Sequence, residues 1–203
     1  MTAALYVDVD RGPYADLLGR DLCWGVDRDA RTYSGPGPVV AHPPCGPWGM
    51  LRGLCRNQDR DAAPFAVAQV RRWGGVLEHP AGSALWKHCG LPAPFRRVPA
   101  FVGREWALQV EQVRWGHPAR KRTWLLFVGV APRDLGPLPP PRRPTHCIGG
   151  SRKPGARGFT GLRVMAGRET HVSPRAFADW LVSAVSASGL RRTRDTLRRT
   201  RDT

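Results

Sequence analysis

Short apolar runs recur along the first two thirds of the chain, and turn-forming or polar residues separate them. Runs of this length that are rich in valine, leucine and aromatic side chains predict β-strands. We therefore expect strands at residues 5–9, 22–27, 39–41, 76–80, 107–110 and 123–128.

Two other segments have the pattern of helices. In residues 62–73 the apolar side chains cluster on one side of a helix, which Gly74 and Gly75 would end. Ser173 suits the N-cap of a second helix, with Pro174 in its first turn. Strands that alternate with helices predict an α/β fold, with a doubly wound, Rossmann-like sheet and a small C-terminal appendage.

The composition changes after residue 130 and divides the chain into four parts. Residues 1–130 hold the predicted α/β domain. Residues 131–170 are basic and rich in proline and glycine, and we expect a loop that meets the substrate; a surface linker without a role is the alternative. Residues 171–190 contain the C-terminal helix. Residues 191–203 are a short basic repeat copied once, and a disordered tail is expected there.

The charge of the chain narrows the choice of partner. The 203 residues include 32 Lys and Arg against 16 Asp and Glu, which gives a net charge of +16. Such an excess favours a polyanionic partner, and nucleic acid is the usual one. Enrichment of arginine throughout the chain is the alternative explanation. The apolar share of 41 % is enough for a globular core.

Several classes of protein are disfavoured. No apolar run is long enough to cross a bilayer, and the first residues lack the basic and apolar regions of a secretion signal, so no membrane partner is expected. Five irregularly spaced cysteines favour reduced thiols in the cytoplasm over a disulfide framework. No cysteine pair has the spacing of a structural zinc site, so no metal is expected. The sequence does not determine the oligomeric state, and a monomer is our expectation.

The strongest candidate for chemistry is Cys45, in the run HPPCGP of residues 42–47 after a predicted strand. Prolines before the cysteine and a glycine–proline pair after it predict a stiff turn that leaves the thiol accessible. A cysteine thiolate is a strong nucleophile, and we expect His42 or nearby arginines to lower the pKa of this thiol. A buried structural cysteine in a tight turn is the alternative.

Two further groups are candidates for the same site. Glu78 lies near the end of another predicted strand, where a half-sheltered carboxyl is expected to have a raised pKa and to donate a proton. Sites in doubly wound sheets form where strands end, so we expect Cys45 and Glu78 to lie together. Alternation along the chain points Arg120 and Arg122 to one face, where they would hold a phosphate or a base carbonyl. Taken singly, the acid and the arginines also suit a solvated surface.

The order of these features resembles the motifs of the C5-cytosine DNA methyltransferases. That family has a Pro-Pro-Cys nucleophile loop, matched by residues 43–45, and then a Glu-Asn-Val-type motif, matched by residues 78–80. A Gly-Val-Pro segment, Arg-x-Arg and an apolar strand follow, matched by residues 116–118, 120–122 and 124–129. The resemblance covers about residues 3–129, and Pro-Pro-Cys is its most specific part.

The resemblance implies a methyltransferase sheet and a cytosine-5 methyltransferase that acts on DNA with S-adenosylmethionine. Cys45 would attack C6 of the pyrimidine ring, Glu78 would protonate or hydrogen-bond N3, and C5 would take the methyl group. Arg122, with Arg120, would hold the base, which must be flipped out of a duplex. Residues 131–170 would form a reduced target-recognition region.

The resemblance also implies where the cofactor would bind, beside Asp8, Gly12, Asp27 and Pro43. Asp27 corresponds to the acid that holds the cofactor's ribose. The glycine-rich turn of the family corresponds to residues 8–13, which contain one glycine and a proline. This departure keeps two alternatives open. The enzyme would modify C5 of a free pyrimidine nucleotide with another donor, or the chain would be an inactive relative that binds nucleic acid through its charge.

Overall fold

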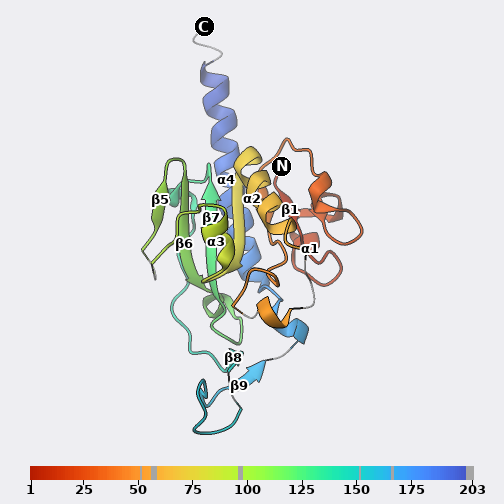
Figure 1. Ribbon diagram of the computed structural model, residues 1–203. Helices are drawn as coiled ribbons and strands as arrows, with labels where there is room; N and C mark the ends of the chain where they lie inside the picture. The colour runs from red at the N-terminus through yellow and green to blue at the C-terminus, as the bar shows by residue number, and fades with distance from the viewer. Residues whose placement is uncertain (51, 56–58, 96–97, 151, 166, 200–203) are drawn as a thin grey trace.

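The computed structural model describes residues 1–50, 52–55, 59–95, 98–150, 152–165 and 167–199. Its centre is a seven-stranded sheet with the order β2-β1-β3-β4-β7-β6-β5 (Figure 1). Strands β2, β1, β3 and β4 are parallel, whereas β7 is antiparallel to β4 and β6, and β5 is antiparallel to β6. The strands are β1 (Ala3–Leu5), β2 (Cys23–Trp24), β3 (Val39–Ala41), β4 (Gly75–Pro80), β5 (Ala100–Val102), β6 (Glu105–Glu111) and β7 (Arg122–Val128).

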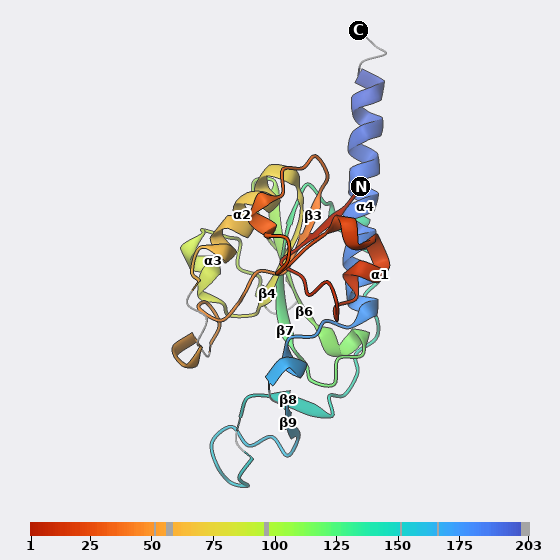
Figure 2. The same ribbon diagram turned by 90° about the vertical axis from the view of Figure 1, so that its right-hand side faces the viewer.

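Helices cover both faces of this sheet, as an edge-on view shows (Figure 2). On one face lie α1 (Tyr14–Leu18) and α4 (Arg175–Arg199), and on the other lie α2 (Ala62–Trp73) and α3 (Ala84–His88). The chain is therefore a mixed α/β protein whose sheet is compatible with the expected Rossmann-like fold. Short 3-10 helices connect these elements: η1 (Arg20–Leu22), η2 (Ala30–Thr32), η3 (Arg52–Leu54), η4 (Gln112–Trp115), η5 (Pro132–Asp134) and η6 (Gly167–Thr170).

The two faces of the sheet bury separate apolar clusters. Val39 and Ala41 of β3 pack in the cluster that contains α2, whereas Val40 between them packs in the cluster that contains α4. A strand buried on both faces is apolar throughout, which explains the apolar runs in the sequence. In the antiparallel half of the sheet, the ring of Trp106 stacks on that of Phe127 with centroids 4.4 Å apart.

The expected elements agree with the structure where their apolar pattern is regular. Strand 39–41 and helix 62–73 have the expected bounds, and strands 76–80, 107–110 and 123–128 lie within β4, β6 and β7. The first two strands are wrong in extent. β1 ends at Leu5 because Tyr6 takes a left-handed backbone conformation with φ 59°, which a strand does not accommodate. β2 ends at Trp24, and Val26 beyond it is 99 % exposed.

The parallel strands end along one edge of the sheet, which we call the carboxyl edge. It consists of the ends of β1, β3 and β4 together with the beginning of β7, since Thr123 of the antiparallel β7 pairs with Pro80 of β4. The order of the strands reverses beside β1, which lies between β2 and β3. In open α/β sheets this reversal leaves a crevice at the carboxyl ends, where ligands bind.

The segment after β7 returns to the carboxyl edge and forms a small unit there. Its proline-rich part is held at two carbonyls: Trp180 Nε1 donates to the Gly136 oxygen at 3.0 Å, and Arg114 donates to the Pro139 oxygen. Strands β8 (His146–Ile148) and β9 (Arg163–Met165) then pair in parallel. Both views show this β8–β9 unit beyond the end of the sheet (Figures 1 and 2).

The C-terminal helix is longer than expected. We expected a helix within residues 171–190 and a disordered tail from residue 191, but α4 continues to Arg199 and its last turns extend past the sheet. Gly189 is an acceptable helix residue at a cost of about 1 kcal/mol, and arginine and leucine favour the helix after it. Residues 200–203 lie outside the described part of the chain. Among the helices that are described, none has the length and apolar character needed to cross a membrane.

The stacked pair Trp106–Phe127 makes the stability of the sheet testable. Phe127 is fully buried, so Phe127→Ala removes apolar contacts and leaves a cavity, which costs about 3–5 kcal/mol. Urea unfolding followed by tryptophan fluorescence measures this loss. Phe65→Ala is the matched control, since Phe65 is 43 % exposed, and it is expected to cost about 1 kcal/mol or less. Equal losses in the two variants would contradict this packing.

Candidate functional site

The turn around Cys45 is rigid and is anchored on both sides. The Cys45 carbonyl accepts hydrogen bonds from the backbone N–H groups of Trp48 and Gly49 at 3.0 and 2.7 Å. The buried Trp48 accepts in turn, through its carbonyl, from the N–H of Ala84 and the hydroxyl of Ser83 at the start of α3. The Cys45 side chain remains partly exposed. The stiff and accessible turn predicted from the sequence is therefore present at the carboxyl edge.

Glu78 lies on β4, next to the strand that leads into this turn. It is buried, and its Oε1 accepts a hydrogen bond from Gln112 Nε2 at 2.9 Å. The other carboxyl oxygen lies 3.3 Å from His42 Nδ1. Gln112 Nε2 also donates to Thr123 Oγ1 at 3.0 Å, which fixes the amide between η4 and β7. The carboxyl group is thus held from two sides.

Tyr14 completes a chain of hydrogen bonds that ends at Glu78. Its hydroxyl contacts His42 Nε2, while His42 Nδ1 faces the carboxyl group. Burial and the charge of Glu78 raise the pKa of Tyr14 well above its usual range, so the phenol keeps its proton. We therefore assign the tyrosine as the donor to Nε2, and the His42 Nδ1–H as the donor to the carboxylate.

Glu78 is ionised, whereas a proton donor was expected at this position from the sequence. Burial alone would raise the pKa of Glu78, but contact with the His42 ring and the charge of Lys121 lower it to about 2. A carboxylate at neutral pH accepts hydrogen bonds and does not donate them. The expectation of a raised pKa was wrong because it considered the burial of Glu78 without the His42 and Lys121 side chains that lower its pKa.

The thiol of Cys45 is protonated at rest. Burial and the charge of Glu78 raise the pKa of Cys45, and the charge of Lys121 opposes them only in part. His42 was expected to lower this pKa, but its two ring nitrogens are directed at Tyr14 and Glu78. Cys45 follows β3, Glu78 lies on β4 and Lys121 precedes β7, so the three groups share the carboxyl edge of neighbouring strands.

The cation of the site is Lys121, which sequence reasoning missed. Its Nζ donates to the carbonyls of His171 and Val172 at 3.2 and 3.1 Å. Burial lowers the pKa of Lys121, and the charges of Glu78 and Cys45 raise it again. The backbone at this lysine is left-handed, with φ 39°, a conformation that is uncommon outside glycine and is often found at functional sites.

The expected arginine clamp is not part of this group. Arg120 and Arg122 are both exposed, and Arg122 Nε lies 3.6 Å from the carboxyl of Glu111 on the neighbouring strand. Strand alternation could not identify Lys121, because its backbone is left-handed and β7 begins only at Arg122. Tyr14 and Gln112 had no local signal either, because each meets Glu78 or its partner only through tertiary structure.

His79 follows the carboxylate and is fully buried against Trp86. Burial lowers the pKa of His79 to about 4, which keeps the ring neutral. The Pro44 carbonyl opposes this lowering electrostatically, yet neither ring nitrogen makes a hydrogen bond within the described part of the chain. His79 is therefore a packing residue beneath the Cys45 turn and adds no charge to the site.

The residues expected to hold S-adenosylmethionine do not form an open cradle for it. Asp8 Oδ1 accepts from the N–H groups of Asp10 and Arg11 at 3.2 and 3.1 Å, and the Asp8 carbonyl accepts from the Gly12 N–H at 2.9 Å. A Cβ on Gly12 would lie 2.4 Å from that carbonyl oxygen. These three N–H groups are satisfied within the turn, so the turn does not fit the cofactor that the resemblance implies.

The other two expected cofactor residues are in different environments. Asp27 is exposed beyond the end of β2, and the neighbouring Arg28 guanidinium lies over the Trp24 ring at 3.8 Å. Pro43 is buried in the turn that carries the thiol. An exposed carboxylate at this position suits a ribose hydroxyl, whereas Pro43 contributes to the shape of the Cys45 turn.

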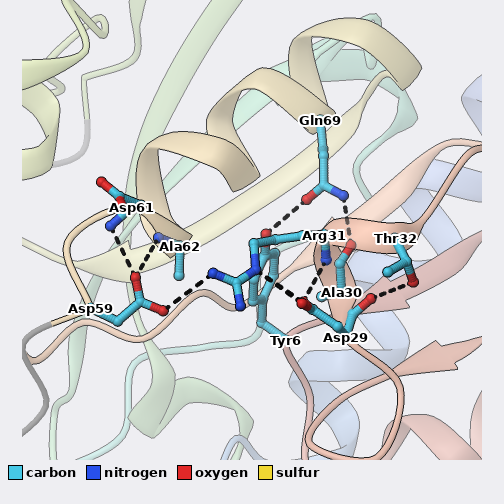
Figure 3. A network of polar contacts seen from close by, with 9 residues as sticks. All are labelled: Tyr6, Asp29, Ala30, Arg31, Thr32, Asp59, Asp61, Ala62 and Gln69. Atoms are coloured by element: carbon cyan, nitrogen blue, oxygen red, sulfur yellow. Dashed lines mark hydrogen bonds and ion pairs between the residues drawn. The ribbon is translucent and has the colours of Figure 1, made fainter.

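A polar network fastens the loops of the carboxyl edge to α2 (Figure 3). Arg31 lies between two acids, 3.1 Å from Asp29 and 3.7 Å from Asp59. Gln69 of α2 accepts a hydrogen bond from the hydroxyl of Tyr6 at 3.0 Å. The left-handed Tyr6 is thereby held at the end of β1, where the strand order reverses.

Comparisons with protein-family models, with curated proteins and with solved structures found no match for this chain. Within its described residues, no three histidine, cysteine, aspartate or glutamate side chains gather as metal ligands.

The lowered pKa of Glu78 predicts how the stability of the protein depends on pH. A carboxyl whose pKa falls from about 4.5 unfolded to about 2 folded stabilises the protein above pH 4.5, and this contribution is lost as the pH falls toward 2. Between pH 5 and 2 the wild type should lose about 3 kcal/mol more than Glu78→Gln in urea unfolding. The exposed Glu169→Gln is the control and should follow the wild type. Parallel curves for wild type and Glu78→Gln would contradict the ionised, paired carboxylate.

Proposed function

We propose that this protein is a DNA cytosine-5 methyltransferase-like enzyme in which Cys45 adds to C6 of a pyrimidine. The observation that carries the proposal is the position of Cys45 after β3, of Glu78 on β4 and of Lys121 before β7, because these three strands are neighbours in the sheet. A nucleophile, an anionic acceptor and a cation are the groups that such an addition needs.

In the addition step, sulfur forms a bond to C6 and the electron pair of the C5–C6 double bond moves toward C5. The thiol of Cys45 must first lose its proton, and we assign the carboxylate of Glu78, whose charge acts on this thiol, as the acceptor. The carboxylate also accepts a hydrogen bond from an N–H of the pyrimidine edge and so orients the ring. Tyr14 and Gln112 are positioning residues, since they act through His42 and Glu78.

Lys121 contributes positive charge where negative charge develops. It stabilises the Cys45 thiolate and, once the base is bound, the charge that spreads into the ring. S-adenosylmethionine is the donor implied by the sequence resemblance, and it would supply the methyl group for C5. The turn at Asp8 and Gly12 does not fit that cofactor, and the roles of Cys45, Glu78 and Lys121 end at the activated C5.

DNA is the proposed partner because the net charge of +16 favours a polyanion. A duplex base would have to be flipped to reach Cys45. Residues 131–170, which contain the β8–β9 unit at the carboxyl edge, would contact the strand in place of a larger recognition region. The cytoplasm, where DNA is accessible and thiols stay reduced, is the location that this function requires, and a monomer would suffice for it.

The closed turn after β1 favours one second candidate, the modification of C5 on a free pyrimidine nucleotide with another one-carbon donor. This candidate keeps the roles of Cys45 and Glu78 and changes the donor and the substrate. An inactive relative that binds nucleic acid through its charge would keep neither role.

A trapped adduct tests the proposal. DNA that contains 5-fluorocytosine should form a covalent complex with the protein in the presence of S-adenosylmethionine, because fluorine at C5 blocks the release of the enzyme. Denaturing electrophoresis and mass spectrometry measure the complex. Cys45→Ser should abolish it, whereas Cys89→Ser, at a partly buried cysteine outside the site, should not.

The same assay separates the candidates. An adduct with a fluorinated nucleotide and a folate-type donor, but not with DNA, would favour the second candidate. DNA binding without any adduct would refute the proposed enzyme, and an adduct that survives Cys45→Ser would refute the nucleophile.

Lys121 and Arg122 form a matched pair for testing the cation. Lys121→Met keeps the aliphatic stem but removes the charge that lowers the Cys45 pKa, so adduct formation should slow by about 10–100-fold at pH 7 and recover as the pH rises. Arg122→Met removes an exposed charge and should change the rate less than threefold, roughly the effect of a surface contact. The pH profile of the single-turnover rate checks both. Equal effects, or an unshifted profile for Lys121→Met, would show that the cation is not Lys121.

A further inference from the structure

The β8–β9 unit contains a cavity that none of the roles above uses. Its wall includes an aromatic ring, Phe159, which is 41 % exposed, and two basic side chains, Arg152 and Arg163. His146 and Glu169 complete its polar lining. The cavity therefore offers a flat apolar surface, two cations and one carboxylate within one hollow.

Few contacts within the described residues engage the charged side chains of the cavity. Among the described residues, no ion pair or side-chain hydrogen bond engages Arg152, Arg163 or Glu169, although seven such ion pairs occur elsewhere. His146 has one, a 2.8 Å contact between its Nδ1 and the Thr145 hydroxyl. Unpaired guanidinium groups beside an exposed ring suit a ligand that has both a phosphate and a planar base.

The cavity is fastened to the strand that carries the site cation. On one side, the Pro118 carbonyl accepts from the N–H groups of Thr145 and His146 at 2.9 and 3.1 Å, three residues before Lys121. On the other side, Lys121 Nζ holds the carbonyls at 171 and 172, which directly follow the 3-10 helix η6 that carries Glu169. Both walls of the cavity are thus anchored near Lys121. A DNA strand whose target base lies at Cys45 would therefore continue along the β8–β9 unit.

We propose that the cavity binds a nucleotide that flanks the target base on the same strand. The flanking base stacks on Phe159, its phosphate lies between Arg152 and Arg163, and Glu169 accepts from an N–H of the base. That the nucleotide belongs to the DNA strand of the target base rests on the proposed function. That the ligand is a nucleotide rests on the side chains of the cavity alone. Stacking on an aromatic ring tolerates every base, so this contact would add affinity with little sequence preference.

Fluorescence of 2-aminopurine tests the stacking directly. The probe is a single-stranded thymidine oligonucleotide with one cytosine and 2-aminopurine beside it, and the protein carries Cys45→Ala so that no chemistry interferes. Binding should quench the fluorophore. Phe159→Ala should remove most of the quenching and weaken binding about tenfold, and Phe159→Trp should restore both. Phe65→Ala, at an exposed phenylalanine on α2, is the control.

The salt dependence of binding tests the arginines. The double variant Arg152→Gln/Arg163→Gln should lower the slope of log Kd against log salt by about 0.7, because the two arginines together neutralise one phosphate of a single strand. Arg104→Gln/Arg133→Gln removes the same charge from exposed positions away from the cavity and should change the slope by less than half as much. Unchanged quenching in Phe159→Ala, or equal slopes in the two double variants, would overturn the proposal.

Competitors identify the source of the nucleotide. If thymidine monophosphate displaces the oligonucleotide at equal concentration, the cavity binds a free nucleotide and the strand proposal is wrong. If inorganic phosphate does so, the ring has no role and the proposal is also wrong. Failure of the fluorocytosine adduct with intact, Phe159-dependent quenching would refute the proposed enzyme and leave the nucleotide site standing. If Phe159→Ala forms the adduct as well as the wild type does, the proposed enzyme stands and the nucleotide site in the cavity is refuted.

Discussion

The buried charge of Glu78 is the constraint on which the site depends. An ionised carboxylate away from water is costly unless hydrogen bonds and opposite charge compensate it. Three separate parts of the chain supply this compensation: His42 after β3, Gln112 in η4, and Lys121 before β7. Each of them must reach the carboxyl edge for the protein to tolerate the charge, so the folding of the sheet and the assembly of the site are one requirement.

The compensation of the Glu78 charge also determines whether the Cys45 thiol is protonated. Glu78 is stabilised as an anion, and its negative charge keeps the nearby Cys45 thiol protonated. The charge of Lys121 lowers the pKa of both groups, so it stabilises the Glu78 anion and partly opposes the protonation of the Cys45 thiol. Under the proposed function, a substrate that neutralises or displaces one of these three groups would change the pKa of the other two, so the thiol would stay protonated and unreactive until a ligand binds. Such a protonated thiol would be less readily oxidised when no substrate is bound.

Elements with a clear local sequence pattern could be predicted from the sequence. Features that depend on tertiary contacts or on left-handed backbone conformations were missed. Helix 62–73 follows from its regular apolar spacing, strand 39–41 from an apolar run after a proline–glycine turn, and the Cys45 turn from its prolines. The left-handed residues Tyr6 and Lys121 break the alternation on which strand prediction relies, which is why β1 was displaced and the cation was assigned to the arginines. The β8–β9 unit has strands of three residues, too short to show a period.

The antiparallel direction of β7 has a geometric consequence for the chain that follows it. β7 starts at the carboxyl edge but ends opposite Gly75, at the other end of the sheet. The segment from 129 to 145 must therefore travel the full length of the domain to deliver β8 back beside Pro118. An extended proline-rich chain rises by about 3.1 Å per residue and resists coiling, so residues 135–145, which follow the 3-10 helix η5, span this distance with little freedom. The length of this stretch, together with the contacts at Pro118 and Lys121, determines how far from the thiol a neighbouring nucleotide would be held in the proposed function.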